Sequence, residues 1–118
     1  MKNPSEIAAM MRHLRLVLVR TNFPENIGMA ARASANFGHA PLYLAEPRRW
    51  NYEKALPTAT SQGRPLLDAV TVTSSVQEAV APCTLVIGTT ARTGGARQQL
   101  IMPRQAAAEI AERLAQGE

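Results

Sequence analysis

A continuous apolar run followed closely by a helix start is the feature that most constrains how this chain can fold. The run is Leu16-Val17-Leu18-Val19, and Pro24 follows five residues after its end. A strand that is apolar on both faces is typical of a parallel sheet covered by helices, and proline suits the first position of a helix. We therefore predict a strand over residues 14–19 and a helix from Pro24. Ligands of open parallel sheets bind where strands end and helices begin, so function is expected just after Arg20.

Strand and helix signals alternate along the rest of the chain. Gly38 is expected to end the first helix, and Pro103 to open the last one. Between them we predict strands over 41–45, 70–73 and 84–88, a helix over 53–62 that stops at Gly63, and a short helix opened by a capping box at Ser75 and Glu78. This alternation predicts an α/β fold with a Rossmann-like parallel sheet and helices on both faces, in a single domain over residues 1–118.

Charge and cysteine content restrict the partners and the compartment. The 118 residues carry 13 Lys and Arg against nine Asp and Glu, a net charge of +4. Most of these cations are Arg, whose planar guanidinium suits phosphate oxygens better than the point charge of Lys does, so a phosphate-rich partner is favoured. Cys83 is the one cysteine in the sequence, which excludes an internal disulfide, and no apolar run approaches the ~20 residues of a membrane span. We expect a soluble, cytoplasmic protein without a membrane partner.

A basic rim is expected at one edge of the sheet. The carboxyl ends of parallel strands share an edge, and the cations nearest to those ends are Arg20, Arg32, Arg48, Arg49, Arg92 and Arg97. Glu25 and Glu46 are the carboxylates that oppose them. Such a rim is the footprint of a phosphate backbone. Solvated side chains with ordinary ion pairs would give the same pattern, and the sequence leaves both interpretations open.

The first helix offers a face on which a ligand could lie. Arg32 follows Gly28 by four residues and precedes Asn36 by four, so the three share one face. Because glycine has no side chain, this face is expected to be open, so that a ligand could approach the helix start and be held by Arg32. A surface ion pair for Arg32 and a packing role for Gly28 are the alternative.

Two loops carry weaker signals. Thr89 and Thr90 could bind a small polar ligand, but their loop matches neither a GxGxxG fingerprint nor a phosphate-binding P-loop. Trp50 and Tyr52 lie in the basic loop and could stack on unpaired bases. For two rings, however, packing in the core or at a subunit interface is favoured.

Other kinds of chemistry find little support. His13, His39 and Cys83 lack the spacing of metal ligands, so no metal is expected. No serine lies in a nucleophile elbow and no pair of carboxylates stands out, which disfavours a hydrolase.

Three stretches form a specific combination: Val19 to Ala33 closed by Asn36-Phe37-Gly38, then Leu42 to Pro47, then Leu85 to Arg92. Together they resemble the SpoU-type RNA ribose methyltransferases of the knotted SPOUT superfamily, and within them the TrmJ/LasT branch. The resemblance implies transfer of a methyl group from S-adenosylmethionine to a ribose 2′-hydroxyl of tRNA or rRNA. It also implies a homodimer whose active site takes residues from both subunits.

Roles for particular residues follow from this resemblance. Asn26 and Arg32 match the catalytic pair of the family's first motif, and Thr89-Thr90-Ala91 match a loop that contacts the cofactor. A charged guanidinium with a pKa above ~12 is a poor base, so Arg32 is expected to hold the acceptor phosphate and orient the hydroxyl.

The family's second and third motifs, which form the knot and most of the cofactor pocket, do not occur before Glu118. The sheet also ends on a helix where a fifth strand should follow. We therefore expect a truncated chain, the N-terminal portion of the enzyme, which is inactive by itself. Two other functions stay open, namely a non-catalytic RNA-binding α/β module and a small nucleotide-binding or signalling α/β domain.

Overall fold

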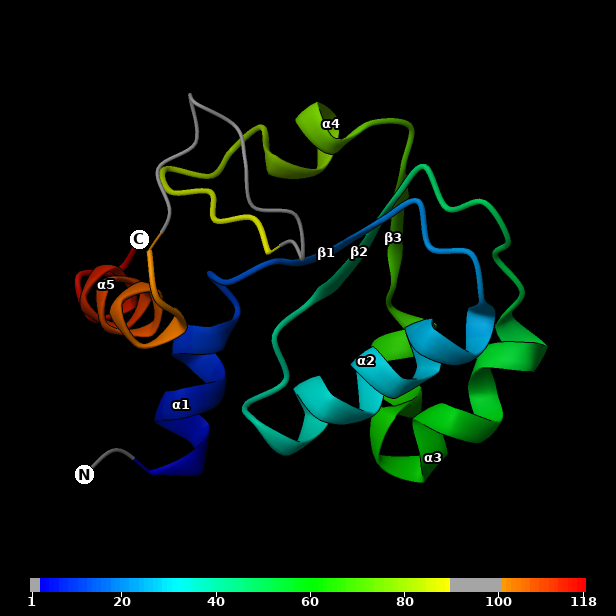
Figure 1. Cartoon of the computed structure of the whole chain (residues 1–118). Helices are drawn as coiled ribbons and strands as arrows, with labels where there is room; N and C mark the ends of the chain where they lie inside the picture. Colours follow the sequence, from blue (N-terminus) through cyan, green and yellow to red (C-terminus); the bar gives the residue numbers. More distant parts are fainter. Residues whose placement is uncertain (1–2, 90–100) are drawn as a thin grey trace.

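Three parallel strands form the centre of the structure, a computed structural model that describes residues 3–89 and 101–118 (Figure 1). The strands lie side by side in the order β1 (Leu16–Val19), β2 (Leu42–Ala45) and β3 (Thr71–Thr73). Both neighbouring pairs are parallel. The predicted parallel α/β fold is confirmed, and these strands lie within the three ranges predicted for them.

The described residues contain five helices: α1 (Pro4–Met11), α2 (Pro24–Asn36), α3 (Tyr52–Asp68), α4 (Val76–Val80) and α5 (Pro103–Ala115). α2 and α5 begin at the predicted prolines, and α4 at the predicted Ser75 cap, which accepts a hydrogen bond from the backbone N–H of Glu78. α1 was not predicted, although Asn3 gives its signal by capping the N–H of Glu6 in the same way. None of these helices is long and apolar enough to cross a membrane.

The core is built from apolar side chains on α2, α3 and one face of the sheet. Its buried members are Ile27 and Ala31 of α2, Leu42 and Leu44 of β2, and Ala55, Ala59 and Leu67 of α3. The other face of the sheet carries α4, above the strands in Figure 1, whose Ala79 is buried. Arg15 ties α4 to the sheet, because its guanidinium donates to the Ala79 carbonyl at 3.0 Å and lies over the ring of Tyr43. Helices on both faces are therefore confirmed.

The predicted end of α3 at Gly63 is wrong. The helix continues to Asp68, with a kink at Thr60, where φ is 61°. Gly63 is buried, and a Cβ atom on it would lie 2.8 Å from the backbone nitrogen of Arg32. This glycine therefore lets α2 and α3 approach each other closely. A glycine ends a helix only where the residues after it leave the helical conformation. Here the residues after Gly63 stay helical, because α3 packs against α2.

The predicted strand over 84–88 is also wrong, because residues 84–89 form neither helix nor strand. Val86, at the middle of the segment, is 58% exposed. β-Branched composition describes side chains that suit a sheet, but a strand also requires a partner for its backbone. Within the described residues β1 pairs with β2 alone, and 84–89 does not join its free edge.

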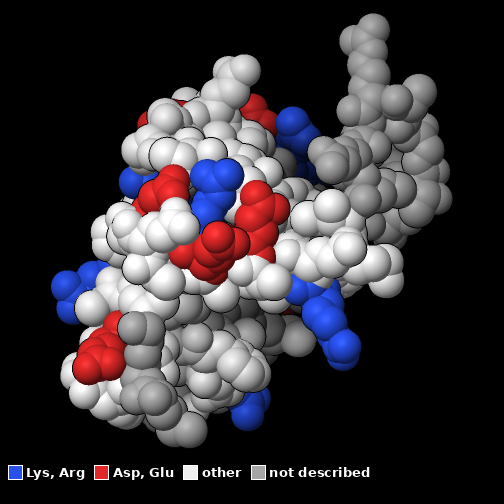
Figure 2. Space-filling view, turned by 90° about the vertical axis from the view of Figure 1, so that its left-hand side faces the viewer, with Lys and Arg blue, Asp and Glu red and all other residues white. Residues whose placement is uncertain are grey.

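Acidic side chains gather over α5, on the face shown in Figure 2. Arg113 pairs there with Glu109 at 3.7 Å and with Glu118 at 3.5 Å. Figure 1 places α5 beyond the amino end of β1, so these carboxylates lie far from the carboxyl edge of the sheet. The positive charge at that edge is therefore not neutralised by α5.

Candidate functional site

The loops that follow β1 and β2 meet at the carboxyl edge of the sheet. The backbone N–H of Arg20 donates to the carbonyl of Ala45 at 2.9 Å, and the N–H of Arg48 donates to the carbonyl of Thr21 at 3.2 Å. Arg20 and Glu46, the first residues after the two strands, have left-handed φ angles of 49° and 50°. Such angles are uncommon outside glycine. The two loops therefore leave the sheet through the same unusual turn and are joined to each other.

Three of the predicted rim arginines lie in these loops. Nε of Arg20 pairs with Oε2 of Glu46 at 2.9 Å, so for this residue the ion-pair interpretation is correct. Arg48 and Arg49 are exposed, and the guanidinium of Arg48 donates to Oδ1 of Asn22 at 3.5 Å. Since neither of these two pairs with a carboxylate of the described chain, both can reach an anionic partner.

The remaining loop residues of the predicted site are largely outside the described residues. These are Thr90, Ala91, Arg92 and Arg97. Thr89 is described and is exposed at the end of the 84–89 segment.

Asn26 and Arg32, the predicted catalytic pair, are both exposed on α2. Asn26 lies in the first turn of the helix and its N–H donates to the carbonyl of Phe23 at 3.0 Å. Six residues of α-helix separate the two by about 9 Å along the axis and about 120° around it. The two side chains therefore point in different directions. Arg32 also lies further from the strand ends than Arg20 and Arg48 do.

The predicted open face at Gly28 is wrong. Gly28 is buried against α3, and a Cβ atom on it would lie 2.0 Å from the carbonyl oxygen of Ala55 and 2.1 Å from Oγ1 of Thr58. The same Thr58 hydroxyl donates to the carbonyl of Glu25 at 2.7 Å. Packing is thus the role of Gly28, as the alternative interpretation had it, and a ligand cannot approach the helix at Gly28 itself.

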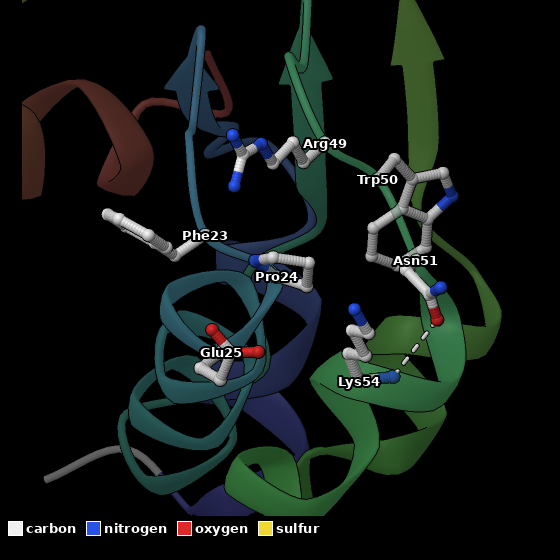
Figure 3. Close-up of a pocket in the computed structure, with 7 residues that line it drawn as sticks. All are labelled: Phe23, Pro24, Glu25, Arg49, Trp50, Asn51 and Lys54. Atoms are coloured by element: carbon white, nitrogen blue, oxygen red, sulfur yellow. Dashed lines mark hydrogen bonds between the residues drawn. The ribbon is translucent and has the colours of Figure 1, made fainter.

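A cavity of about 390 Å³ lies between the start of α2 and the basic loop that leads into α3 (Figure 3). Its lining consists of Phe23, Pro24, Glu25, Arg49, Trp50, Asn51 and Lys54. In Figure 3 the side chain of Arg49 reaches across the top of the cavity, above Pro24, while Lys54 points up into it from α3. Two cations from different elements thus face one hollow at the carboxyl edge.

Sequence reasoning missed Phe23 and Lys54 as members of this site. Lys54 had a usable signal, because it lies in the first turn of α3, where its N–H donates to the capping Oδ1 of Asn51 at 3.1 Å. A cation in the first turn of a helix is disfavoured by the helix dipole. Lys54 therefore does not stabilise the start of α3, and its position next to a basic loop indicated a role in binding.

The two rings of the basic loop are fixed in different ways. Trp50 is half-buried and packs against the core, as predicted. Tyr52 also packs there, and its hydroxyl donates to Oδ1 of Asp68, which joins the two ends of the kinked α3. The hydrogen bond to the Asp68 carboxylate raises the pKa of the Tyr52 phenol above its ordinary value.

This raised pKa predicts how stability changes with pH. The folded state binds the phenolic proton more tightly than the unfolded state does, so the stabilisation is complete below the ordinary pKa of about 10 and is lost as pH rises through the folded-state pKa. We expect Tyr52→Phe to lower the free energy of unfolding at pH 8 and to differ less from wild type above pH 10. Urea unfolding at a series of pH values measures this. The same difference in unfolding free energy at all pH values would contradict the prediction. Tyr43→Phe is the control, because the Tyr43 hydroxyl has no hydrogen-bond partner in the described chain.

A metal centre finds no support in the part of the chain that the structure describes. No three His, Cys, Asp or Glu side chains are grouped there in a way that could hold a metal ion.

Known proteins resemble most of this chain. A model described as the SpoU rRNA Methylase family matches residues 13–113. The tRNA (cytidine/uridine/adenosine-2'-O-)-methyltransferase TrmJ of Pseudomonas aeruginosa is 39% identical over 105 residues, which are 89% of this chain and 40% of that protein. An uncharacterized tRNA/rRNA methyltransferase of Haemophilus influenzae is 35% identical over 101 residues, covering 86% of this chain and 41% of its own.

A solved structure agrees with this. The crystal structure of TrmJ from Z. mobilis ZM4 superposes with a TM-score of 0.75 at 43% sequence identity, over 81% of this chain and 43% of that one. The chain therefore spans about two fifths of the length of the curated relatives described above.

Proposed function

The chain belongs to the SpoU rRNA Methylase family, and from this we propose that the protein transfers a methyl group from S-adenosylmethionine to a ribose 2′-hydroxyl of tRNA or rRNA. The family match over residues 13–113 carries the proposal. The basic carboxyl edge supports it, because cations that neutralise phosphates bind an RNA backbone. The name of the Pseudomonas aeruginosa relative, a tRNA 2'-O-methyltransferase, supports it as well.

We assign Arg32 and Asn26 to different parts of the acceptor strand. Arg32 is exposed, and no carboxylate of the described residues pairs with it. Its guanidinium can therefore hold an acceptor phosphate through two parallel hydrogen bonds. Because it stays charged, it orients the hydroxyl and leaves proton removal to another group. Asn26, about 9 Å nearer the strand ends, positions the adjoining ribose through its amide.

S-adenosylmethionine supplies an electrophilic methyl group on its sulfonium. The residues proposed to contact the cofactor are Thr89, Thr90 and Ala91. The exposure of Thr89 supports this assignment, because its hydroxyl can donate to or accept from polar groups of a ligand.

The proposal includes a homodimer in the cytoplasm, with an active site that takes residues from both subunits. Large apolar side chains support association, because Met29 is 56% and Phe37 is 78% exposed along and just beyond α2. The free thiol of Cys83 supports a reducing compartment.

A methyl-transfer assay of the full-length protein tests the proposal. The substrates are S-adenosylmethionine with a labelled methyl group and tRNA or rRNA transcripts without modifications. We expect label in alkali-resistant dinucleotides, because a methylated 2′-hydroxyl can no longer attack its phosphodiester. DNA of the same sequence, which lacks that hydroxyl, should stay unlabelled.

Two outcomes would replace the proposal with its rivals. RNA binding that weakens with salt, without any incorporation of label, would indicate a non-catalytic RNA-binding module. Indifference to RNA would indicate a nucleotide-binding or signalling domain.

A further inference from the structure

We propose that the cavity between the start of α2 and the basic loop binds one unpaired nucleotide of the RNA, next to the nucleotide that is methylated. This inference rests on the proposed function, and it assigns the cavity a part in RNA recognition. Its residues are Trp50 for the base and Arg49 and Lys54 for the phosphate.

The size and rigidity of the cavity suit such a ligand. Its volume of about 390 Å³ falls in the range of about 300–1,000 Å³ that small-molecule sites occupy. Pro24 is buried and forms one wall, while Asn51 holds the opposite wall by capping α3. Both walls begin helices that pack tightly on each other through Gly28 and Gly63. The cavity is therefore present before any ligand binds.

The aromatic side chain of Trp50 lies at the wall of the cavity. Trp50 is half-buried, since part of it packs against the core and part lines the cavity. Core contacts fix the ring, so little conformational entropy is lost when a base stacks on it. Phe23, which is 54% exposed, lies on the other side of Pro24 from Trp50 in Figure 3. Bases inside a duplex are stacked on one another, so this arrangement selects an unpaired one.

The charges favour a nucleotide over the cofactor. Arg49 and Lys54 bring two positive charges from two different elements to the cavity, and neither pairs with a carboxylate of the described residues. These cations attract a phosphate and repel the sulfonium of S-adenosylmethionine. Glu25, below Pro24 in Figure 3, can accept a hydrogen bond from a base amine or a ribose hydroxyl.

The cavity continues the path of the basic loops. Arg48, next to Arg49 in sequence, is exposed, and its backbone binds the loop after β1 through the Thr21 carbonyl. An RNA strand can therefore contact Arg48 with one phosphate and place the next nucleotide in the cavity. The acceptor then lies along α2, where Asn26 and Arg32 are exposed.

Variants of the full-length protein test this inference with unmodified tRNA transcripts as the probe. We expect Arg49→Ala and Lys54→Ala each to weaken RNA binding about fivefold and to reduce the slope of log Kd against log salt by about 0.7. Trp50→Leu should weaken binding about tenfold, the loss of one stacked base, while Trp50→Phe, which keeps a ring, should stay within about threefold. The KM for S-adenosylmethionine should not change. Arg104→Ala on α5, across the molecule from the cavity, is the control for general loss of charge.

Each other outcome overturns the inference in a distinct way. If all cavity variants bind RNA with wild-type affinity, the cavity has no role in RNA binding. If the same variants still transfer methyl groups, the proposed function stands without the cavity. An equal loss in Arg104→Ala would indicate nonspecific attraction, and a raised KM for S-adenosylmethionine would make the cavity a cofactor site. If wild type transfers no methyl group, the binding measurements still test the cavity. Circular dichroism and thermal unfolding confirm that the Trp50 variants are folded.

Discussion

Gly28→Ala should destabilise the fold by about 3 kcal/mol, a large share of the roughly 5–15 kcal/mol that stabilises a typical domain. The added Cβ would lie 2.0 Å from the backbone carbonyl oxygen of Ala55. A backbone atom in a helix cannot swing aside, so α2 and α3 must separate. Their separation also strains the hydrogen bond from Thr58 to the Glu25 carbonyl. The gain in helix propensity from Gly to Ala, about 1 kcal/mol, is too small to offset this.

Urea unfolding with a common m-value measures the effect of Gly28→Ala. Gly88→Ala is the control, because no atom of residues 3–89 or 101–118 lies within 4 Å of a Cβ atom at that position. We expect that control to change stability by less than about 0.5 kcal/mol. Equal stability of the two variants would show that α2 and α3 do not pack closely at Gly28.

Arg32→Ala should reduce kcat for methyl transfer by about a hundredfold or more in the full-length protein, because an acceptor that is no longer held in position reacts far more slowly. The fold should not change, since the side chain is exposed and pairs with no carboxylate of the described residues. Labelled-methyl incorporation into unmodified transcripts measures the rate, and thermal unfolding checks the fold.

Two further variants separate the role of Arg32 from that of charge alone. Arg32→Lys keeps the charge but loses the planar pair of donors, so it should recover only part of the rate. Arg104→Ala removes an exposed cation from α5 and should keep wild-type activity. Unchanged turnover in Arg32→Ala would remove this residue from the proposed site.

Local sequence signals were sufficient where a single element decided the outcome. The apolar run 16–19 and the prolines at 24 and 103 placed β1, α2 and α5, because strand composition and helix starts depend on neighbouring residues. The order of these elements predicted the parallel sheet, since a helical crossover joins strands in that direction. The motif around Asn26 and Arg32 indicated the family.

The cavity could not be predicted in this way. Phe23 and Lys54 are 31 residues apart in the sequence and belong to different elements. They line one hollow because β1 and β2 are neighbours and their loops are hydrogen-bonded at the carboxyl edge. The same contact pairs Arg20 with Glu46, while Arg48 and Arg49 of the loop after β2 pair with no carboxylate of the described residues.

The sequence by itself determined the α/β class, the order of the elements and the family, because these depend on residue types along the chain. Tertiary structure alone decided what the glycines do and which strand-like segments become strands. Gly28 and Gly63 lie in helices, and which side of a helix meets its neighbour depends on the packing of α2 on α3. Residues 84–88 have the composition of a strand but no partner among the described residues. Close approach and strand pairing are properties of two segments together, so neither segment encodes them alone.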